Sequence, residues 1–165
     1  MLPQDDARET ASGTVETGDA ELVAGAGDLV GLRFPLHLDP GARILSARLQ
    51  LSAASASLQS ASIRIEAQAS VDAPPFQELV GNLSFRQRGE EDVLWLTEDW
   101  VHAGARGPRQ QSPDLASILQ EVVDRAGWSS GNALVLLLSA EDGQRVLRSA
   151  DQPGASGAQL TIEYD

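Results

Sequence analysis

Residues 112–139 have the sequence SPDLASILQEVVDRAGWSSGNALVLLLS, in which a helical pattern is followed by a strand pattern. The apolar residues of the first half recur at i, i+3, i+4, i+7 and i+8, and they are Leu115, Ile118, Leu119, Val122 and Val123. That spacing places them on one face of an α-helix. Ser112 suits the N-cap, Pro113 suits the first helical position, and Gly127 suits the left-handed position after the last turn. The pattern therefore predicts a helix over about residues 113–126.

The second half of this stretch predicts a buried strand. Trp128 and a short turn lead into Ala133–Ser139, a run that is almost entirely apolar. A lone helix in a chain of strands must bury its apolar face against a sheet. We expect Trp128 to anchor the helix to that sheet.

The rest of the chain mostly alternates between apolar and polar residues. The clearest alternating runs are residues 45–52, 61–68 and 159–164. One buried face and one solvated face are typical of strands in an antiparallel sheet. Turn residues separate the strands at Asp39-Pro40-Gly41-Ala42 and at Glu141-Asp142-Gly143-Gln144, and we expect a hairpin at the second.

These features predict an all-β fold. We expect two packed antiparallel sheets, a sandwich of jelly-roll type, with one short α-helix (about 113–126) packed on it. Residues 1–12 are polar and are expected to form a loose N-terminal segment. Residues 13–165 are expected to form a single β-sandwich domain, because 165 residues suffice for one sizeable core.

The charge composition argues against several classes of partner. The chain has 24 acidic and 12 basic residues, a net charge of −12, and every basic residue is an arginine. Nucleic acids and anionic membranes need a basic patch, which this sequence lacks. Two explanations of the composition stay open, namely the coding bias of a GC-rich genome and a salt-adapted acidic surface.

Targeting and cross-linking features are scarce as well. The chain has no cysteine and therefore no disulfide framework. No stretch is long and apolar enough to suggest a membrane span, and the first residues lack the features of a signal peptide. If the protein is exported, we expect this chain to be a mature fragment.

Several short motifs resemble those of a known family. They are Gly31-Leu32-Arg33-Phe34, Asp39-Pro40-Gly41-Ala42-Arg43-Ile44, Ala47-Arg48-Leu49-Gln50-Leu51, Pro113-Asp114-Leu115, Gln120-Glu121-Val122-Val123-Asp124-Arg125, Gly127-Trp128, Ser130-Gly131-Asn132-Ala133-Leu134 and Leu160-Thr161-Ile162-Glu163-Tyr164. Together they resemble the DNRLRE-type β-sandwich modules of secreted or surface bacterial proteins, some of which are classed as carbohydrate-binding family 96. The resemblance covers most of the chain from about Asp5 and implies an extracellular or cell-surface setting. The matching residues are turn, cap and core residues, so no sugar-binding residue carries over.

The sequence offers no convincing catalytic set. Gly127-Trp128-Ser129-Ser130-Gly131 matches the Gly-x-Ser-x-Gly string of a nucleophile elbow, which needs a strand before the serine and a helix after it. Here that order is reversed, and the only histidines, His37 and His102, lie upstream. Glu90-Glu91-Asp92 and Glu98-Asp99 could supply a glycosidase pair, but such pairs arise readily in so acidic a chain. We therefore expect no enzymatic activity.

Acidic residues near the N-terminus raise the question of a structural Ca²⁺. Hard oxygen ligands suit this ion, and the acids concerned are Asp5, Asp6, Glu9, Asp19 and Glu21. Asp151 or Asp165 could join them if the fold brings either one near. Their spacing is not that of an EF-hand, so ordinary solvated acids stay open as the alternative.

A carbohydrate site would need exposed aromatic rings as stacking platforms. Phe34 and Tyr164 are expected to point inward, which leaves Trp95 and Trp100 as the candidate platforms, with Glu98 and Asp99 beside them. These four residues form the predicted ligand-binding site.

The sequence is compatible with two functions. The first is a non-catalytic extracellular module with a structural, adhesive or assembly role in a larger secreted or surface protein. Its partners would be neighbouring modules or copies of itself. The alternative is a carbohydrate-binding module that binds a polysaccharide, with Ca²⁺ as its only expected cofactor.

Overall fold

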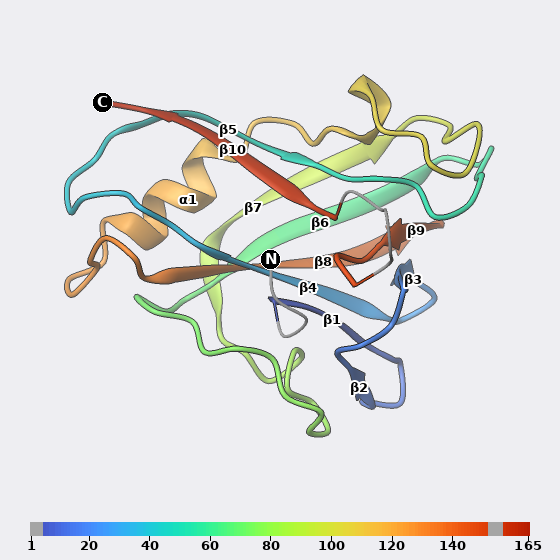
Figure 1. Ribbon diagram of the computed structural model, residues 1–165, viewed down its shortest axis with the longest axis horizontal. Coiled ribbons are helices and arrows are strands. Elements are labelled where there is room, and N and C mark those ends of the chain that lie inside the picture. Colours follow the sequence, from blue (N-terminus) through green and yellow to red (C-terminus); the bar gives the residue numbers. More distant parts are fainter. Residues whose placement is uncertain (1–4, 152–156) are drawn as a thin grey trace.

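The computed structural model describes residues 5–151 and 157–165, which form mostly antiparallel strands (Figure 1). Six strands make the main sheet, in the order β2-β1-β4-β8-β6-β7. Their bounds are β1 (Asp6–Glu9), β2 (Val15–Glu16), β4 (Leu29–Pro35), β6 (Ala61–Gln68), β7 (Arg88–Thr97) and β8 (Ala133–Asp142). Each neighbouring pair in this sheet is antiparallel.

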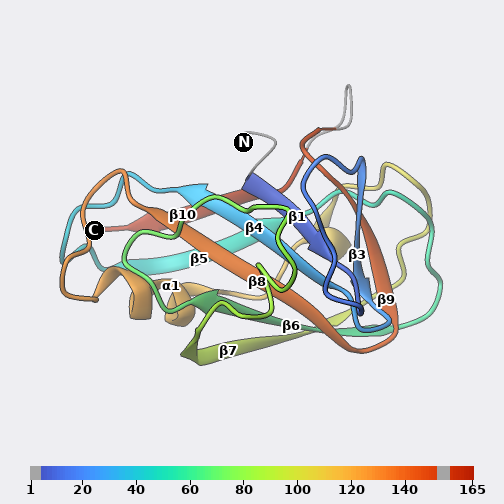
Figure 2. The ribbon, with the colours of Figure 1, turned by 90° about the horizontal axis from the view of Figure 1, so that it is seen from below.

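Two smaller antiparallel sheets pack against the main one (Figure 2). One joins β5 (Ile44–Gln50) to β10 (Gln159–Tyr164), and the other joins β3 (Glu21–Gly25) to β9 (Gln144–Arg148). Leu49 of β5 and Leu147 of β9 belong to the same buried cluster as Leu136 of β8. The predicted fold class, an all-β antiparallel sandwich with a helix packed on it, is confirmed.

Strand β8 is buried on both faces of the main sheet. Its even-numbered leucines, 134, 136 and 138, belong to the core between the sheets. Val135 and Leu137 belong to a second apolar cluster on the opposite face, which Phe76 and Leu83 cover from the loop between β6 and β7. In Figure 2 this loop, drawn in green, crosses over β4 and β8. Burial on both faces explains why the β8 sequence is an unbroken apolar run.

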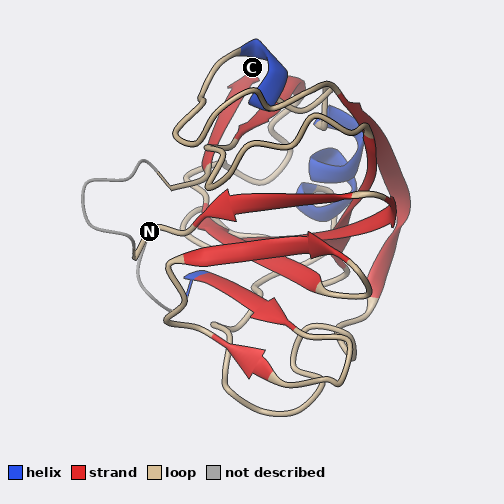
Figure 3. Cartoon of the chain, turned by 90° about the vertical axis from the view of Figure 1, so that its right-hand side faces the viewer, coloured by secondary structure: helices blue, strands red, loops and turns tan. Residues whose placement is uncertain are grey.

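Helix α1 (Ala116–Val123) is shorter than the predicted 113–126 and has strands on either side of it (Figure 3). Ser112 does not cap it, because its hydroxyl accepts a hydrogen bond from Leu49 N at 2.9 Å. Asp114 accepts bonds from Ala116 N and Ala47 N, so the residues before the helix tie it to β5. In the described ranges, no helix has the length and apolarity needed to cross a membrane.

The helix ends at Val123, before the predicted end at about residue 126, but the residues after it attach it to the core as the sequence predicts. Gly127 takes a φ of 101° in the turn that follows the helix, in which Trp128 N donates to Arg125 O. Trp128 is buried in the core cluster together with Ile118 and Leu119 of the helix. Its indole Nε1 donates a hydrogen bond to Leu38 O at 2.9 Å. The predicted anchoring role of Trp128 is confirmed.

Helix α1 also covers part of the outer edge of β7. The Glu121 carboxylate accepts hydrogen bonds from Glu90 N and Glu91 N, both at 3.0 Å. The bond from Glu91 N is the main cause of the lowered pKa of Glu121. Gly89 leaves the space for this approach, since a Cβ there would lie 2.6 Å from Glu121 Oε2. Backbone donors at this edge are thus unavailable for pairing with another strand.

Two expectations about the chain path are wrong. Residues 1–12 are not all loose, because Asp6–Glu9 form β1 and pair with both β2 and β4. The turn at Gly143 exists, but it does not close a hairpin. Strand β9 leaves the main sheet after this turn and pairs with β3, whereas β8 pairs with β4 and β6.

Candidate functional site

The two tryptophans predicted to be platforms are buried. Trp95 is 5% exposed and Trp100 is 0% exposed, and their ring centroids lie 6.4 Å apart. Trp100 Nε1 donates a hydrogen bond to Arg109 O at 3.0 Å. Glu98 and Asp99 are exposed, and Glu98 lies 3.2 Å from the Arg109 guanidinium. The expectation of an exposed tryptophan site is therefore wrong, because both indoles are part of the sandwich core.

An arginine that the sequence reading did not single out lies beside this tryptophan pair. The buried Arg145 guanidinium donates to Gln59 O at 2.7 Å and to Glu98 O at 2.9 Å. Its central carbon lies 5.5 Å from the centre of the Trp100 ring. Burial lowers the pKa of Arg145, while the nearby Asp99 carboxylate raises it. Arg145 ties the chain on either side of the tryptophans together, which is a structural role.

The acids predicted to bind Ca²⁺ do not converge. Asp5 lies 2.8 Å from Arg33, and Glu9 Oε2 accepts bonds from the backbone of the 69–87 loop. Asp19 is half-buried and Glu21 is exposed. In the part of the chain that the structure describes, no three His, Cys, Asp or Glu side chains are grouped to hold a metal ion. Asp6 is buried and accepts a hydrogen bond from Ala150 N.

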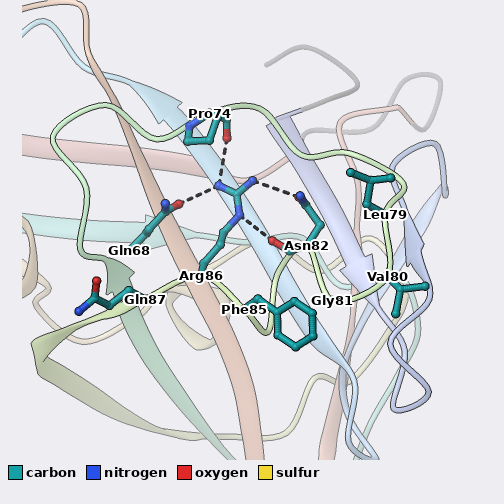
Figure 4. A pocket seen from close by; sticks show the side chains of 9 residues that line it. All are labelled: Gln68, Pro74, Leu79, Val80, Gly81, Asn82, Phe85, Arg86 and Gln87. Atoms are coloured by element: carbon teal, nitrogen blue, oxygen red, sulfur yellow. Dashed lines mark hydrogen bonds between the residues drawn. The ribbon is translucent and has the colours of Figure 1, made fainter.

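The most distinctive surface lies on the loop between β6 and β7. Leu79, Val80 and Phe85 are 59%, 74% and 82% exposed, and we call these three residues the apolar tip. They border an open hollow of about 450 Å³ whose polar lining includes Gln68, Asn82, Arg86 and Gln87 (Figure 4). The fold thus presents a cluster of apolar side chains to solvent on the face of the main sheet opposite the core.

The buried Arg86 guanidinium holds this loop together. It donates to Pro74 O, Pro75 O and Asn82 O at 2.9–3.1 Å, and also to the side-chain oxygens of Gln68 and Asn82 (Figure 4). It also lies 4.6 Å from the centre of the Phe76 ring. Burial is the main cause that lowers the pKa of Arg86, and Arg33 and Arg88 lower it further. Neutral oxygen atoms, without a carboxylate, therefore stabilise this buried charge.

The same hydrogen bonds fix the orientation of two amide groups. Since Gln68 Oε1 and Asn82 Oδ1 accept from Arg86, their NH₂ groups remain as donors at the hollow. Among the described residues neither NH₂ group has a hydrogen-bond partner. The hollow therefore combines fixed polar donors with an exposed aromatic ring.

Phe85 is held against the backbone of its own loop. Gly81 has a φ of 77°, and a Cβ at this position would lie 2.4 Å from the Phe85 ring. Gly81 N donates to Gly13 O at 3.0 Å, and Leu83 N donates to the Glu9 carboxylate at 2.7 Å. The loop is therefore fixed to the strands beneath it, and the exposed ring has a defined position.

Arg86→Lys is expected to release this loop. One ammonium group has three donors and cannot serve the five acceptors that the planar guanidinium reaches. We expect a loss of about 2 kcal/mol in the free energy of unfolding, together with faster chymotrypsin cleavage at Leu79 and Phe85. Limited proteolysis with mass spectrometry checks this, with the exposed Arg43→Lys as the control. Equal cleavage rates in the two variants would show that Arg86 does not hold the loop.

Comparison with known proteins adds no family to this description. No protein-family model matches the chain, and no curated protein matches it in sequence. The resemblance to DNRLRE-type modules therefore stays a prediction.

Proposed function

We propose that the protein is a non-catalytic extracellular module with an adhesive or assembly role, and that the apolar tip contacts another protein module. The observation that carries this proposal is the exposure of Leu79, Val80 and Phe85 together on an internally hydrogen-bonded loop. Exposed apolar clusters of this kind are costly in solution and typical of interaction sites. A loop that is already ordered also loses little conformational entropy on binding.

The charge of the chain favours a different protein over a second copy as the partner. A net charge of −12 makes two copies repel each other, most strongly at low ionic strength. An aromatic ring flanked by two aliphatic side chains matches the apolar centre of a protein interface better than a purely polar ligand does. A neighbouring module of the parent protein is the partner that fits best.

The test is a titration of this chain against the modules that adjoin it in the parent protein, by isothermal calorimetry. The double variant Leu79→Ser, Phe85→Ser is expected to weaken binding by at least about 30-fold, since hot-spot residues contribute roughly 2 kcal/mol or more. Leu58→Ser, which changes an equally exposed leucine outside the loop, is the control. Undiminished binding by the double variant would contradict the proposal.

A second candidate function is carbohydrate binding at the same hollow. The observation that favours it is the Phe85 ring beside the fixed amide donors of Gln68 and Asn82, because sugars stack on aromatic rings and accept hydrogen bonds. On this alternative, a glycan array gives signals that Phe85→Ser removes and Leu58→Ser keeps. A blank array, with and without Ca²⁺, would exclude this second function and leave the protein-contact proposal in place.

A further inference from the structure

Two carboxylates from opposite ends of the chain meet beside β1. Asp6 is 1% exposed, and its Oδ2 accepts a hydrogen bond from Ala150 N at 2.7 Å. Asp151 follows Ala150 directly and is half-buried. The charges of Asp151 and Asp5 both act on the Asp6 carboxylate. Strand β1 is thereby joined to the residues that follow β9.

One oxygen of each carboxylate has no partner. Asp6 Oδ1 and Asp151 Oδ2 are both buried, and neither forms a hydrogen bond with any residue that the structure describes. Burial of a carboxylate oxygen without a partner costs free energy, and the negative charge of Asp151 adds to the cost of ionising Asp6. Burial, with Asp151 and Asp5 adding to it, raises the pKa of Asp6 to about 6.

Two other buried carboxylates pair with arginines, while buried Glu9 accepts hydrogen bonds from Leu83 N and Ser84 N. Asp5 lies 2.8 Å from Arg33, and Asp28 pairs with Arg8 at 2.6 Å. Among the described residues, no arginine forms an ion pair with Asp6 or Asp151. Within the described ranges, the hydrogen bond from Ala150 N is thus the contact that stabilises the ionised Asp6 carboxylate.

We propose that Asp6 Oδ1 and Asp151 Oδ2 bind a divalent cation of the Ca²⁺ class. Carboxylate oxygens are the ligands that Ca²⁺ prefers, and its irregular coordination sphere accepts water at the remaining positions. Two protein carboxylates make a weak site, with a dissociation constant of about 10⁻⁴–10⁻³ M, the range of extracellular modules. The site differs from the predicted acidic cluster, because Glu9, Asp19 and Glu21 take no part in it.

The bound cation stabilises the folded chain at one particular junction. It links β1 to the segment after β9. Because β1 pairs with β4 in the main sheet and β9 pairs with β3 in a smaller sheet, the cation connects these two sheets. A ligand that binds only the folded state raises its stability in proportion to the logarithm of the ligand concentration. The protein is thus expected to be more stable where Ca²⁺ is abundant.

Thermal unfolding at neutral pH tests this site. About 10 mM CaCl₂ is expected to raise the midpoint by about 3–6 °C over NaCl of equal ionic strength, for a dissociation constant near 1 mM. Asp6→Asn and Asp151→Asn should each abolish that increment, whatever their effect on the midpoint without calcium. Asp142→Asn, which alters an exposed acid elsewhere, should keep it.

Two results of these unfolding experiments would contradict the proposed cation site. If the wild-type midpoint with CaCl₂ equals that with NaCl, the carboxylates share a proton rather than a cation and the proposal is wrong. It is also wrong if Asp6→Asn and Asp151→Asn keep the calcium increment, because Ca²⁺ then binds elsewhere. Neither result bears on the apolar tip, which lies on a different loop.

Discussion

Trp128→Ala is expected to lower the free energy of unfolding by about 3–5 kcal/mol, among the largest effects of any single substitution in this chain. The indole is buried in the core cluster that also contains the apolar face of α1, so its removal leaves a cavity in that core. The Leu38 carbonyl, itself in a buried residue, also loses its hydrogen-bond donor. Urea unfolding followed by circular dichroism measures the change.

Two companion variants separate the causes of this loss. Trp128→Phe keeps most of the ring volume and removes the donor to Leu38, so it is expected to lose about 1–2 kcal/mol. Leu58→Ala changes an exposed side chain and should leave stability within about 0.5 kcal/mol of the wild type. A Trp128→Ala variant as stable as the wild type would mean that the indole does not anchor the helix.

The helix, the turn after it and strand β8 could be predicted because each has a local signal. The helical period of residues 115–123, the glycine at 127 and the apolar run of β8 each require burial or a special backbone conformation. The boundaries were less predictable. Ser112 and Asp114 look like capping residues in sequence, but β5 lies close enough to use them as hydrogen-bond acceptors.

The binding surface could not be predicted in the same way. Residues 76–87 fit neither the helical nor the strand period, because their order comes from the side chain of Arg86 and not from a backbone ladder. Phe76 and Phe85 cannot be told apart from the sequence pattern. In the structure Phe76 is buried against Gly31, whereas Phe85 is exposed beside Gly81. Tertiary contacts alone decide which aromatic ring reaches solvent.

Strand β7 and strand β1 differ in how much their local sequence patterns reveal. Trp95 alternates with the outward Leu94 and Leu96, so its inward direction could have been read from the strand period. Strand β1 gives no such signal, because Asp6 and Glu9 are charged and still buried. Glu9 finds its partners in the 69–87 loop, 74 residues further along the chain, and Asp6 finds one at Ala150.

Asp6→Asn is expected to stabilise the protein at pH 7 by up to about 3 kcal/mol in the presence of a chelator. The folded state raises the pKa of Asp6 from 3.8 to about 6, mainly through burial. Between these two values the folded protein binds more protons than the unfolded chain, so stability falls as the pH rises through this window. Above pH 6 the full cost of the buried charge is present, and asparagine removes it.

The asparagine side chain also fits the hydrogen bonds at this position. Its Oδ1 can accept from Ala150 N as the carboxylate does, and its uncharged NH₂ group replaces the unpartnered carboxylate oxygen. We expect the gain in unfolding free energy to shrink progressively from pH 7 to pH 4, since wild-type Asp6 is then neutral in the folded state. Urea unfolding at several pH values measures both trends, with the exposed Asp142→Asn as the control. A gain that stays constant over this range would show that the buried charge of Asp6 is not its source.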